Sequence, residues 1–127
     1  MTRWIAAILA LLMVTNGLFM LGQPQAWYDA VPGVPLTGLF NPHFVRDIGM
    51  AYLTVAGGLA WFAWRPVQGW PALVLSAAFL ALHASIHVVD SACGPGPLQT
   101  ALRDFPGVYL PPLIAGALAF LNRPKGV

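Results

Sequence analysis

Charged residues are scarce in this sequence. Asp, Glu, Lys and Arg make up 8% of the 127 residues, and all of the acids are aspartates. Soluble domains carry about a quarter charged residues. Hydrophobic residues make up 58% of the chain, so the composition excludes an ordinary soluble enzyme and predicts an integral membrane protein. The net charge of +2 comes without a cluster of basic residues, which argues against nucleic-acid binding.

Cysteine is also nearly absent, since Cys93 is the single one. No disulfide can therefore form within the chain. The thiol could be inert, pair with another chain or act as a metal ligand. The sequence also lacks a nucleophile motif, a nucleotide-binding loop and a recognisable cofactor motif, so no motif supports an enzyme.

Long apolar stretches are abundant, at approximately residues 4–21, 45–64, 70–90 and 103–121. Each is close to the roughly 20 residues that a helix needs to cross the hydrocarbon core of a membrane. The sequence therefore predicts a single all-α membrane domain over residues 1–127. We expect an antiparallel bundle of four transmembrane helices with a long outer loop 1.

The first apolar stretch could be mistaken for a signal peptide. The only plausible cleavage site, at residues 24–26, has proline where a small residue is required. We therefore expect this segment to be retained.

The basic residues predict the orientation in the membrane. With four spans, one side of the membrane receives four cations: Arg3, Arg65, Arg123 and Lys125. On the other side, the two arginines are each followed by an aspartate, as Arg46-Asp47 and Arg103-Asp104. Lys and Arg in short loops favour the cytoplasmic side. We expect a multi-pass protein of the plasma (inner) membrane with both termini in the cytoplasm.

Two proline-rich regions have structural consequences. Loop 1, residues 22–42, combines prolines with Trp, Tyr and Phe, and such aromatics favour the membrane interface. We expect it to pack across the outer end of the bundle as a lid. Pro111-Pro112 removes two backbone donors from the fourth span, which predicts a kink in one long helix.

All three histidines lie near the outer side, close to most of the acids. His43 and Asp47 open the second span, and His83, His87 and Asp90 close the third. Residues three and four apart share a helix face, so each of these spans has one polar stripe. Ionisable groups in membrane spans are costly and indicate function by default. We expect both stripes to face the interior and each other.

Histidines at positions i and i+4, with a carboxylate one turn away, can hold one metal ion. Imidazole and carboxylate together suit zinc, copper or iron. The predicted metal ligands are His43, Asp47, His83, His87 and Asp90, to which Cys93 could add a thiolate. Haem fits less well, because it needs a large apolar slot. In the alternative interpretation, these His and Asp side chains form structural hydrogen-bonded pairs.

Other conspicuous residues have structural explanations. Three methionines are expected to fill the core, and three glycines are expected to permit close helix contact. These residues are Met13, Met20 and Met50, and Gly57, Gly58 and Gly116.

The entry to the second span reads Asn-Pro-His-Phe-Val-Arg-Asp-Ile-Gly, residues 41–49. With four spans in a short chain and a long first outer loop, it resembles the small DoxX-like membrane proteins. The resemblance implies a four-helix bundle and a redox-associated or accessory role, and it assigns no residue roles.

We therefore expect an accessory membrane protein that binds a metal ion or a redox ligand at a periplasm-facing site. One alternative is a non-catalytic subunit of a larger membrane complex. Another is a membrane enzyme acting on a lipid or quinone, with His and Asp as acid and base. The expected partners are the lipid bilayer and either another membrane protein or further copies of the chain.

Overall fold

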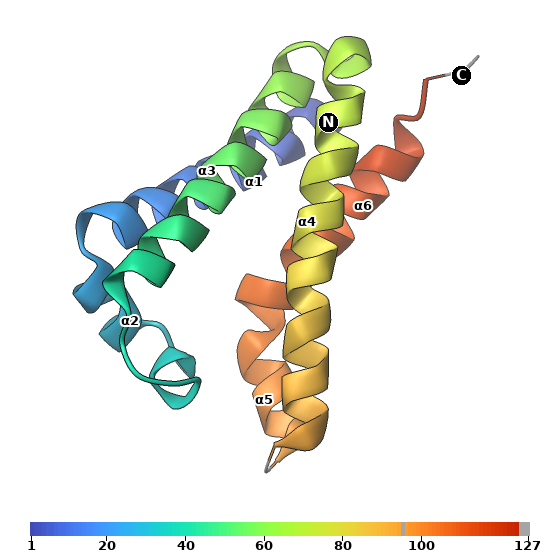
Figure 1. Ribbon diagram of the computed structural model, residues 1–127. Coiled ribbons are helices and arrows are strands. Elements are labelled where there is room, and N and C mark those ends of the chain that lie inside the picture. Colours follow the sequence, from blue (N-terminus) through green and yellow to red (C-terminus); the bar gives the residue numbers. More distant parts are fainter. Residues whose placement is uncertain (95, 125–127) are drawn as a thin grey trace.

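The computed structural model describes residues 1–94 and 96–124, and over these residues the chain is helical without any strand (Figure 1). The all-α prediction is therefore confirmed for this part of the chain. In order, the elements are α1 (Thr2–Gly22), α2 (Pro24–Ala30), the short 3-10 helix η1 (Val34–Leu36), α3 (Pro42–Trp64), α4 (Pro66–Cys93), α5 (Pro97–Asp104), the π-helical segment η2 (Phe105–Tyr109) and α6 (Leu110–Leu121).

Three helices are long and apolar enough to cross a membrane, which is consistent with a membrane protein. They are α1, α4 and the continuous helical stretch Pro97–Leu121. The helix α3 has 23 residues, yet it is not among them. Its glycines, its Tyr and Trp side chains and its charged first turns dilute its apolar character. α3 therefore has the length predicted for the second span but not the apolar character, and a bundle of four transmembrane helices is not confirmed.

The helices form two hairpins that diverge toward one end of the molecule (Figure 1). The first hairpin pairs α1 with α3, and the second pairs α4 with α5, η2 and α6. Contact between α3 and α4 joins the hairpins, and a single residue, Arg65, separates these two helices. The N-terminus and the end of α6 lie at one end, where Thr2 Oγ1 donates to Asn122 Oδ1 at 3.2 Å. We call this the terminal end and the opposite one the α5 end.

Close packing between helices depends on glycine at a few positions. A Cβ added to Gly17 would lie 2.8 Å from the Gly49 carbonyl oxygen, where α1 crosses α3. Gly58 similarly lies directly against Ser76 and the Ala72 carbonyl oxygen of α4, so the predicted close contact is confirmed there. The same prediction is wrong for Gly57 and Gly116, because a Cβ at either would meet nothing within 4 Å.

The three methionines differ in burial. Met13 and Met20 are buried in the core as predicted, whereas Met50 is 57% exposed. The prediction of core filling is wrong for Met50 because it lies on the outward face of α3.

Prolines shape the last helix as the sequence predicts. The Leu110 N–H bonds the Phe105 carbonyl oxygen, five residues back, which defines the π-helical segment before Pro111 and Pro112. The helix is not broken there, since Pro97–Leu121 continues through this segment. Its axis changes direction between α5 and α6 (Figure 1). Segments with π geometry are often found at functional sites.

Loop 1 is ordered by its aromatic side chains. Trp27 Nε1 donates to Asn16 Oδ1 at 2.9 Å, which ties α2 to α1. The Tyr28 hydroxyl donates to the Gly38 carbonyl oxygen at 2.6 Å, and its ring packs on Phe40 with centroids 5.3 Å apart. These contacts fold the loop on itself at the α5 end.

Candidate functional site

The predicted polar stripe of α3 points away from the interior. The buried face of α3 consists of Val45, Gly49, Tyr52, Val55, Ala56, Leu59 and Phe62. The stripe that begins at His43 and Asp47 and continues through Thr54 lies on the exposed face. The prediction that it faces inward is therefore wrong, because α1 and α4 bury the apolar side of this helix instead.

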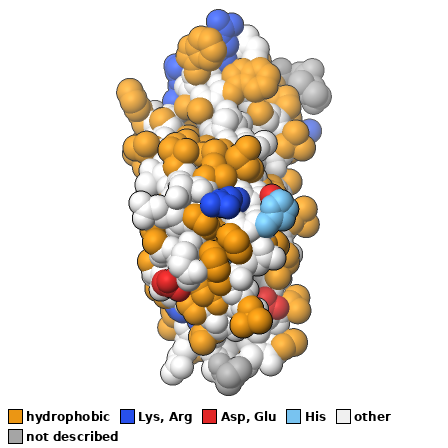
Figure 2. Space-filling model, turned by 60° about the vertical axis from the view of Figure 1, so that its left-hand side comes forward, with side chains coloured by type: hydrophobic (Ala, Val, Ile, Leu, Met, Phe, Trp, Pro, Cys, Tyr) orange, Lys and Arg blue, Asp and Glu red, His pale blue; other side chains and the backbone are white. Residues whose placement is uncertain are grey.

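His43 and Asp47 do meet, but only within one exposed helical turn. His43 Nε2 lies 3.3 Å from Asp47 Oδ2, and the two side chains are 87% and 61% exposed. Figure 2 shows the side of the molecule from which a histidine and a basic side chain project among hydrophobic ones. Among the described residues, this pair does not form a metal-binding group with the other histidines.

The polar stripe of α4 faces the interior, as predicted, over most of its length. Ser76 and Leu80 are buried, and His83 and His87 follow at helical spacing, partly buried. The rings of His83 and His87 lie edge to face with centroids 4.9 Å apart. Phe79 stacks nearly parallel to His83 at 6.3 Å. The two imidazoles therefore form a compact pair on one face of α4.

Tyr52 of α3 packs against this pair from the first hairpin. Its ring lies edge to face with His83, at a centroid distance of 5.9 Å. Tyr52 also meets Phe79 in a T-shaped contact at 6.3 Å. The site is therefore aromatic on the side toward the middle of the molecule.

Asp104, at the end of α5, completes the cluster. Its side chain is only 6% exposed, and Oδ2 lies 3.0 Å from His87 Nδ1. Arg103 donates to the same carboxylate twice, from Nε to Oδ1 at 2.7 Å and from Nη2 to Oδ2 at 3.2 Å. The carboxylate is thereby neutralised by a bidentate guanidinium, the strong form of this interaction.

The Asp104 contact determines the chemistry available to His87. A carboxylate that accepts from Nδ1 places the proton of a neutral imidazole on that nitrogen. Nε2 of His87 then carries a lone pair, which can ligate a metal ion or accept a proton. Ligating histidines are commonly held in this way by a carboxylate behind them.

Ser91 lies one turn beyond His87 on the same face of α4. It is 6% exposed, and its Oγ is the buried side-chain polar atom that finds no hydrogen-bond partner among the described residues. A buried polar group without a partner is costly and often marks a place for water, an ion or a ligand. The face that carries His83 and His87 therefore has a third, unused polar group.

The remaining predicted ligands lie outside the cluster. Asp90 and Cys93 are both exposed on the last turns of α4. No group of three or more His, Cys, Asp or Glu side chains is placed to hold a metal ion in residues 1–94 and 96–124. The structure thus brings His83 and His87 together, and it does not gather the five predicted ligands around one point.

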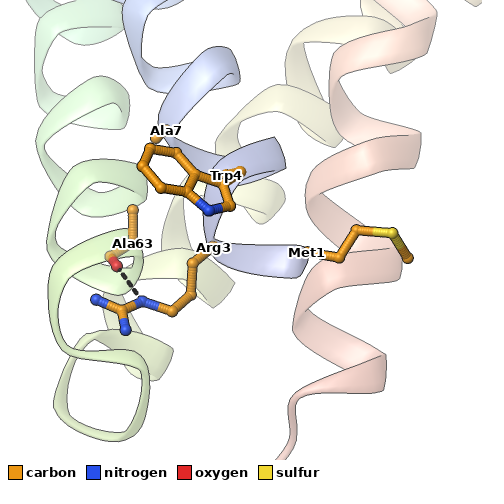
Figure 3. Close-up of a pocket in the computed structure, with 5 residues that line it drawn as sticks. All are labelled: Met1, Arg3, Trp4, Ala7 and Ala63. Carbon is orange, nitrogen blue, oxygen red and sulfur yellow. Dashed lines mark hydrogen bonds between the residues drawn. The ribbon is translucent and has the colours of Figure 1, made fainter.

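Two hollows elsewhere lack histidines and acids. One, of about 250 Å³, lies at the terminal end and is lined by Met1, Arg3, Trp4, Ala7 and Ala63 (Figure 3). There Arg3 Nε donates to the Ala63 carbonyl oxygen at 2.7 Å and Nη2 to the Trp64 carbonyl oxygen at 3.0 Å, so its guanidinium caps the end of α3. The other is an apolar groove of about 420 Å³ beside α4, lined by Ala81, Ala84, Ser85, Val88, Tyr109, Pro112 and Leu113.

Sequence reasoning missed Asp104 and Ser91 as members of the site. Asp104 is seventeen positions from His87, so helical spacing could not connect them. Ser91 does follow His83 and His87 at steps of four, and this spacing could have included it in the stripe.

Comparison with known proteins adds no family assignment: no family model, curated protein or solved structure matched the chain.

Proposed function

We propose that this protein is an accessory membrane protein that binds a metal ion or a redox ligand through His83 and His87 at the α5 end. The observation that supports the proposal is the 3.0 Å contact from Asp104 to His87 Nδ1, which leaves Nε2 available. Holding a carboxylate, a guanidinium and two imidazoles in a membrane helix pair is costly. A purely apolar contact between α4 and α5 would avoid that cost, so a ligand is the simplest reason for the polar cluster.

For a metal ion, His83 and His87 supply two nitrogen ligands from one helix face, and Asp104 orients the second imidazole. Imidazole suits zinc, copper and iron. The ion would keep open positions, since two of the described side chains, His83 and His87, would ligate it. His43, Asp47 and Asp90 take no part in this version of the site because their side chains are exposed.

The proposed topology has four spans, with α3 as the second, and both termini in the cytoplasm. Arg3, Arg65 and Arg123 support this orientation, whereas Lys125 lies outside the described residues. The α5 end then faces the periplasm of an inner membrane. A reporter that is active only in the cytoplasm, fused after Val127, should be active; periplasmic activity from a matching reporter would reverse the orientation.

Metal binding is tested on detergent-purified protein loaded separately with Zn(II), Cu(II) and Fe(II), then desalted and analysed by mass spectrometry. One of these metals should remain at about one equivalent, and His83→Ala and His87→Ala should each lose it. His43→Ala is the matched control, because its imidazole is equally present but exposed, and it should retain the metal. Loss of metal in all three variants, or in none, would contradict the proposal.

The redox-ligand form has separate support in the aromatic rings of Tyr52 and Phe79 beside His83. An apolar ring bearing a hydroxyl, such as a quinol, could lie against them and donate to His87 Nε2. Calorimetric titration with a short-chain quinol should show binding that His87→Ala removes and His43→Ala preserves. If neither metal nor quinol binds, the polar cluster holds α4 and α5 together, as in a non-catalytic subunit of a larger complex.

A further inference from the structure

Arg103 contacts loop 1 as well as Asp104. Gly33, between α2 and η1, has φ +89°, and a Cβ added to it would overlap the Cζ, Nη1 and Nε atoms of Arg103. The guanidinium therefore lies directly on the backbone of loop 1. Glycine is needed here both for its left-handed conformation and for the space that the guanidinium occupies.

A continuous chain of contacts thus runs from loop 1 to the paired histidines. Gly33 touches Arg103, Arg103 holds Asp104 through two hydrogen bonds, and Asp104 holds His87. The chain crosses from the first hairpin to the second, because loop 1 is tied to α1 through Trp27 and Asn16. It does so at the α5 end, where the hairpins otherwise diverge (Figure 1).

We propose that Arg103 is a latch that couples the position of residues 31–40 within loop 1 to the state of the Asp104–His87 pair. While Asp104 is held by His87, it fixes the guanidinium, and the guanidinium fixes Gly33. A ligand that binds His87 Nε2 keeps Nδ1 on Asp104 and strengthens that hydrogen bond, so it holds the guanidinium and the loop more firmly. The ligand-dependent part of this coupling rests on the proposed function, whereas the latch itself does not.

The geometry explains why arginine is required at this position. Two of the guanidinium nitrogens, Nε and Nη2, donate to the Asp104 carboxylate, while Cζ, Nη1 and Nε lie against Gly33. A planar guanidinium can bind a carboxylate along one edge while the body of the group packs on another partner. Lysine would offer a single ammonium and could not hold both partners in this way.

The latch is tested by measuring a distance between loop 1 and α4 with spin labels. Leu36 in η1 and Leu82 on α4 are 83% and 68% exposed, so each can be changed to cysteine in a Cys93→Ser background. Double electron–electron resonance in detergent, without added metal, should give one narrow distance distribution. Arg103→Gln should broaden it at least about twofold, and Arg46→Gln, the matched control on the first hairpin, should leave it unchanged.

Asp104→Asn provides the decisive variant, because the Asp104 carboxylate bonds to Arg103 and His87 and to no described residue of loop 1. The coupling predicts that this substitution also broadens the distribution, although it changes no residue of the loop. Circular dichroism before each measurement confirms that the helical content is kept. Unchanged distributions in both Arg103→Gln and Asp104→Asn would overturn the latch.

Alanine substitutions at the two glycines with positive φ in loop 1 distinguish the effect of backbone strain from the effect of losing the Arg103 contact. Gly33 faces Arg103, whereas Gly38, with φ +149°, has nothing within 4 Å of an added Cβ. Gly33→Ala should broaden the distribution more than Gly38→Ala does, and adding Arg103→Gln to Gly33→Ala should broaden it no further. Equal broadening by the two alanine variants would mean that strain alone moves the loop.

Addition of Zn(II) to the labelled wild-type protein separates this inference from the proposed function. Bound zinc that narrows the distribution further supports both, whereas bound zinc that leaves it unchanged or broadens it overturns the ligand coupling alone. If no zinc binds but Asp104→Asn still releases the loop, zinc is excluded as the ligand while the latch stands.

Discussion

The dipeptide Arg-Asp occurs twice in this protein, as Arg46-Asp47 and Arg103-Asp104, and each aspartate lies beside a histidine. The distances are similar, 3.3 Å from His43 to Asp47 and 3.0 Å from His87 to Asp104. The surroundings differ: the Asp47 side chain is 61% exposed and that of Asp104 only 6%. Similar local sequence thus gives one pair open to its surroundings and one enclosed between helices.

The two arginines differ as much as the aspartates. Arg103 donates twice to its own neighbour, Asp104. Arg46 instead reaches the Leu21 carbonyl oxygen at 3.4 Å, at the end of α1. Only the second dipeptide therefore builds a neutralised carboxylate that can orient a histidine. An ion pair gains importance from burial, because removal of one partner then leaves a charge without compensation.

The largest expected effect follows from removing the buried partner. Arg103→Ala should lower the free energy of unfolding by about 3 kcal/mol, the low end for a broken buried ion pair, because it removes the bidentate partner of the enclosed Asp104 carboxylate and leaves only the contact with His87. Arg46→Ala should change it by no more than about 0.5 kcal/mol, as is usual for an exposed position. Denaturant titration in mixed micelles, followed by circular dichroism, measures both.

A double variant sharpens this first test. If the cost in Arg103→Ala arises from the stranded carboxylate, adding Asp104→Asn should recover part of the lost stability, because it removes the uncompensated charge. Equal losses in Arg103→Ala and Arg46→Ala would show that burial does not distinguish the two dipeptides.

Helical periodicity predicted the existence of both polar stripes but the direction of only one. In α4 the stripe through Ser76, His83 and His87 faces other helices, as expected. In α3 the apolar face is just as regular as the polar one, and it is the apolar face that packs against α1 and α4. Spacing shows which residues share a face; the neighbouring helices decide whether that face is covered.

The lengths and order of the long helices were predictable, because apolar stretches near membrane length have few alternatives, whereas α2 and η1 lie within the segment expected to be loop 1. The kinked continuation through Pro111 and Pro112 was predictable for the same reason. The partner of His87 was not. It depends on how α5 packs back along α4, and no period in the sequence reports that geometry.

The next largest difference in stability is expected between alanine variants of two adjacent glycines in α3. Gly58→Ala should destabilise the protein by about 1–3 kcal/mol, since its Cβ would force Ser76 and the backbone of Ala72 apart from α3. Gly57→Ala should stabilise it by up to about 1 kcal/mol, because alanine favours helix and the position is open. The same denaturant titration measures both variants. If both change the free energy of unfolding in the same direction, the close contact of Gly58 with α4 is contradicted.

Two buried serines of α4 should differ by a smaller amount. Ser76 Oγ donates to the Val55 carbonyl oxygen at 3.1 Å, so Ser76→Ala should cost about 1 kcal/mol. Ser91 Oγ lacks a partner among the described residues, so Ser91→Ala should leave stability unchanged or raise it by up to about 1 kcal/mol. A clear loss in Ser91→Ala, measured without added ligand, would show that its hydroxyl is already satisfied, by water or by the backbone.

The smallest expected effect belongs to the exposed pair. His43→Ala and Asp47→Ala should each change the free energy of unfolding by less than about 0.5 kcal/mol, which is typical of exposed pairs at positions i and i+4. Because the two side chains are open to their surroundings, their interaction should vanish at about 1 M salt, where the Debye length is about 3 Å. The coupling of His87 with Asp104, measured by a double-mutant cycle, should persist at that salt because the pair is enclosed. A His43–Asp47 coupling that equals the buried one and resists salt would mean that another molecule covers this face of α3.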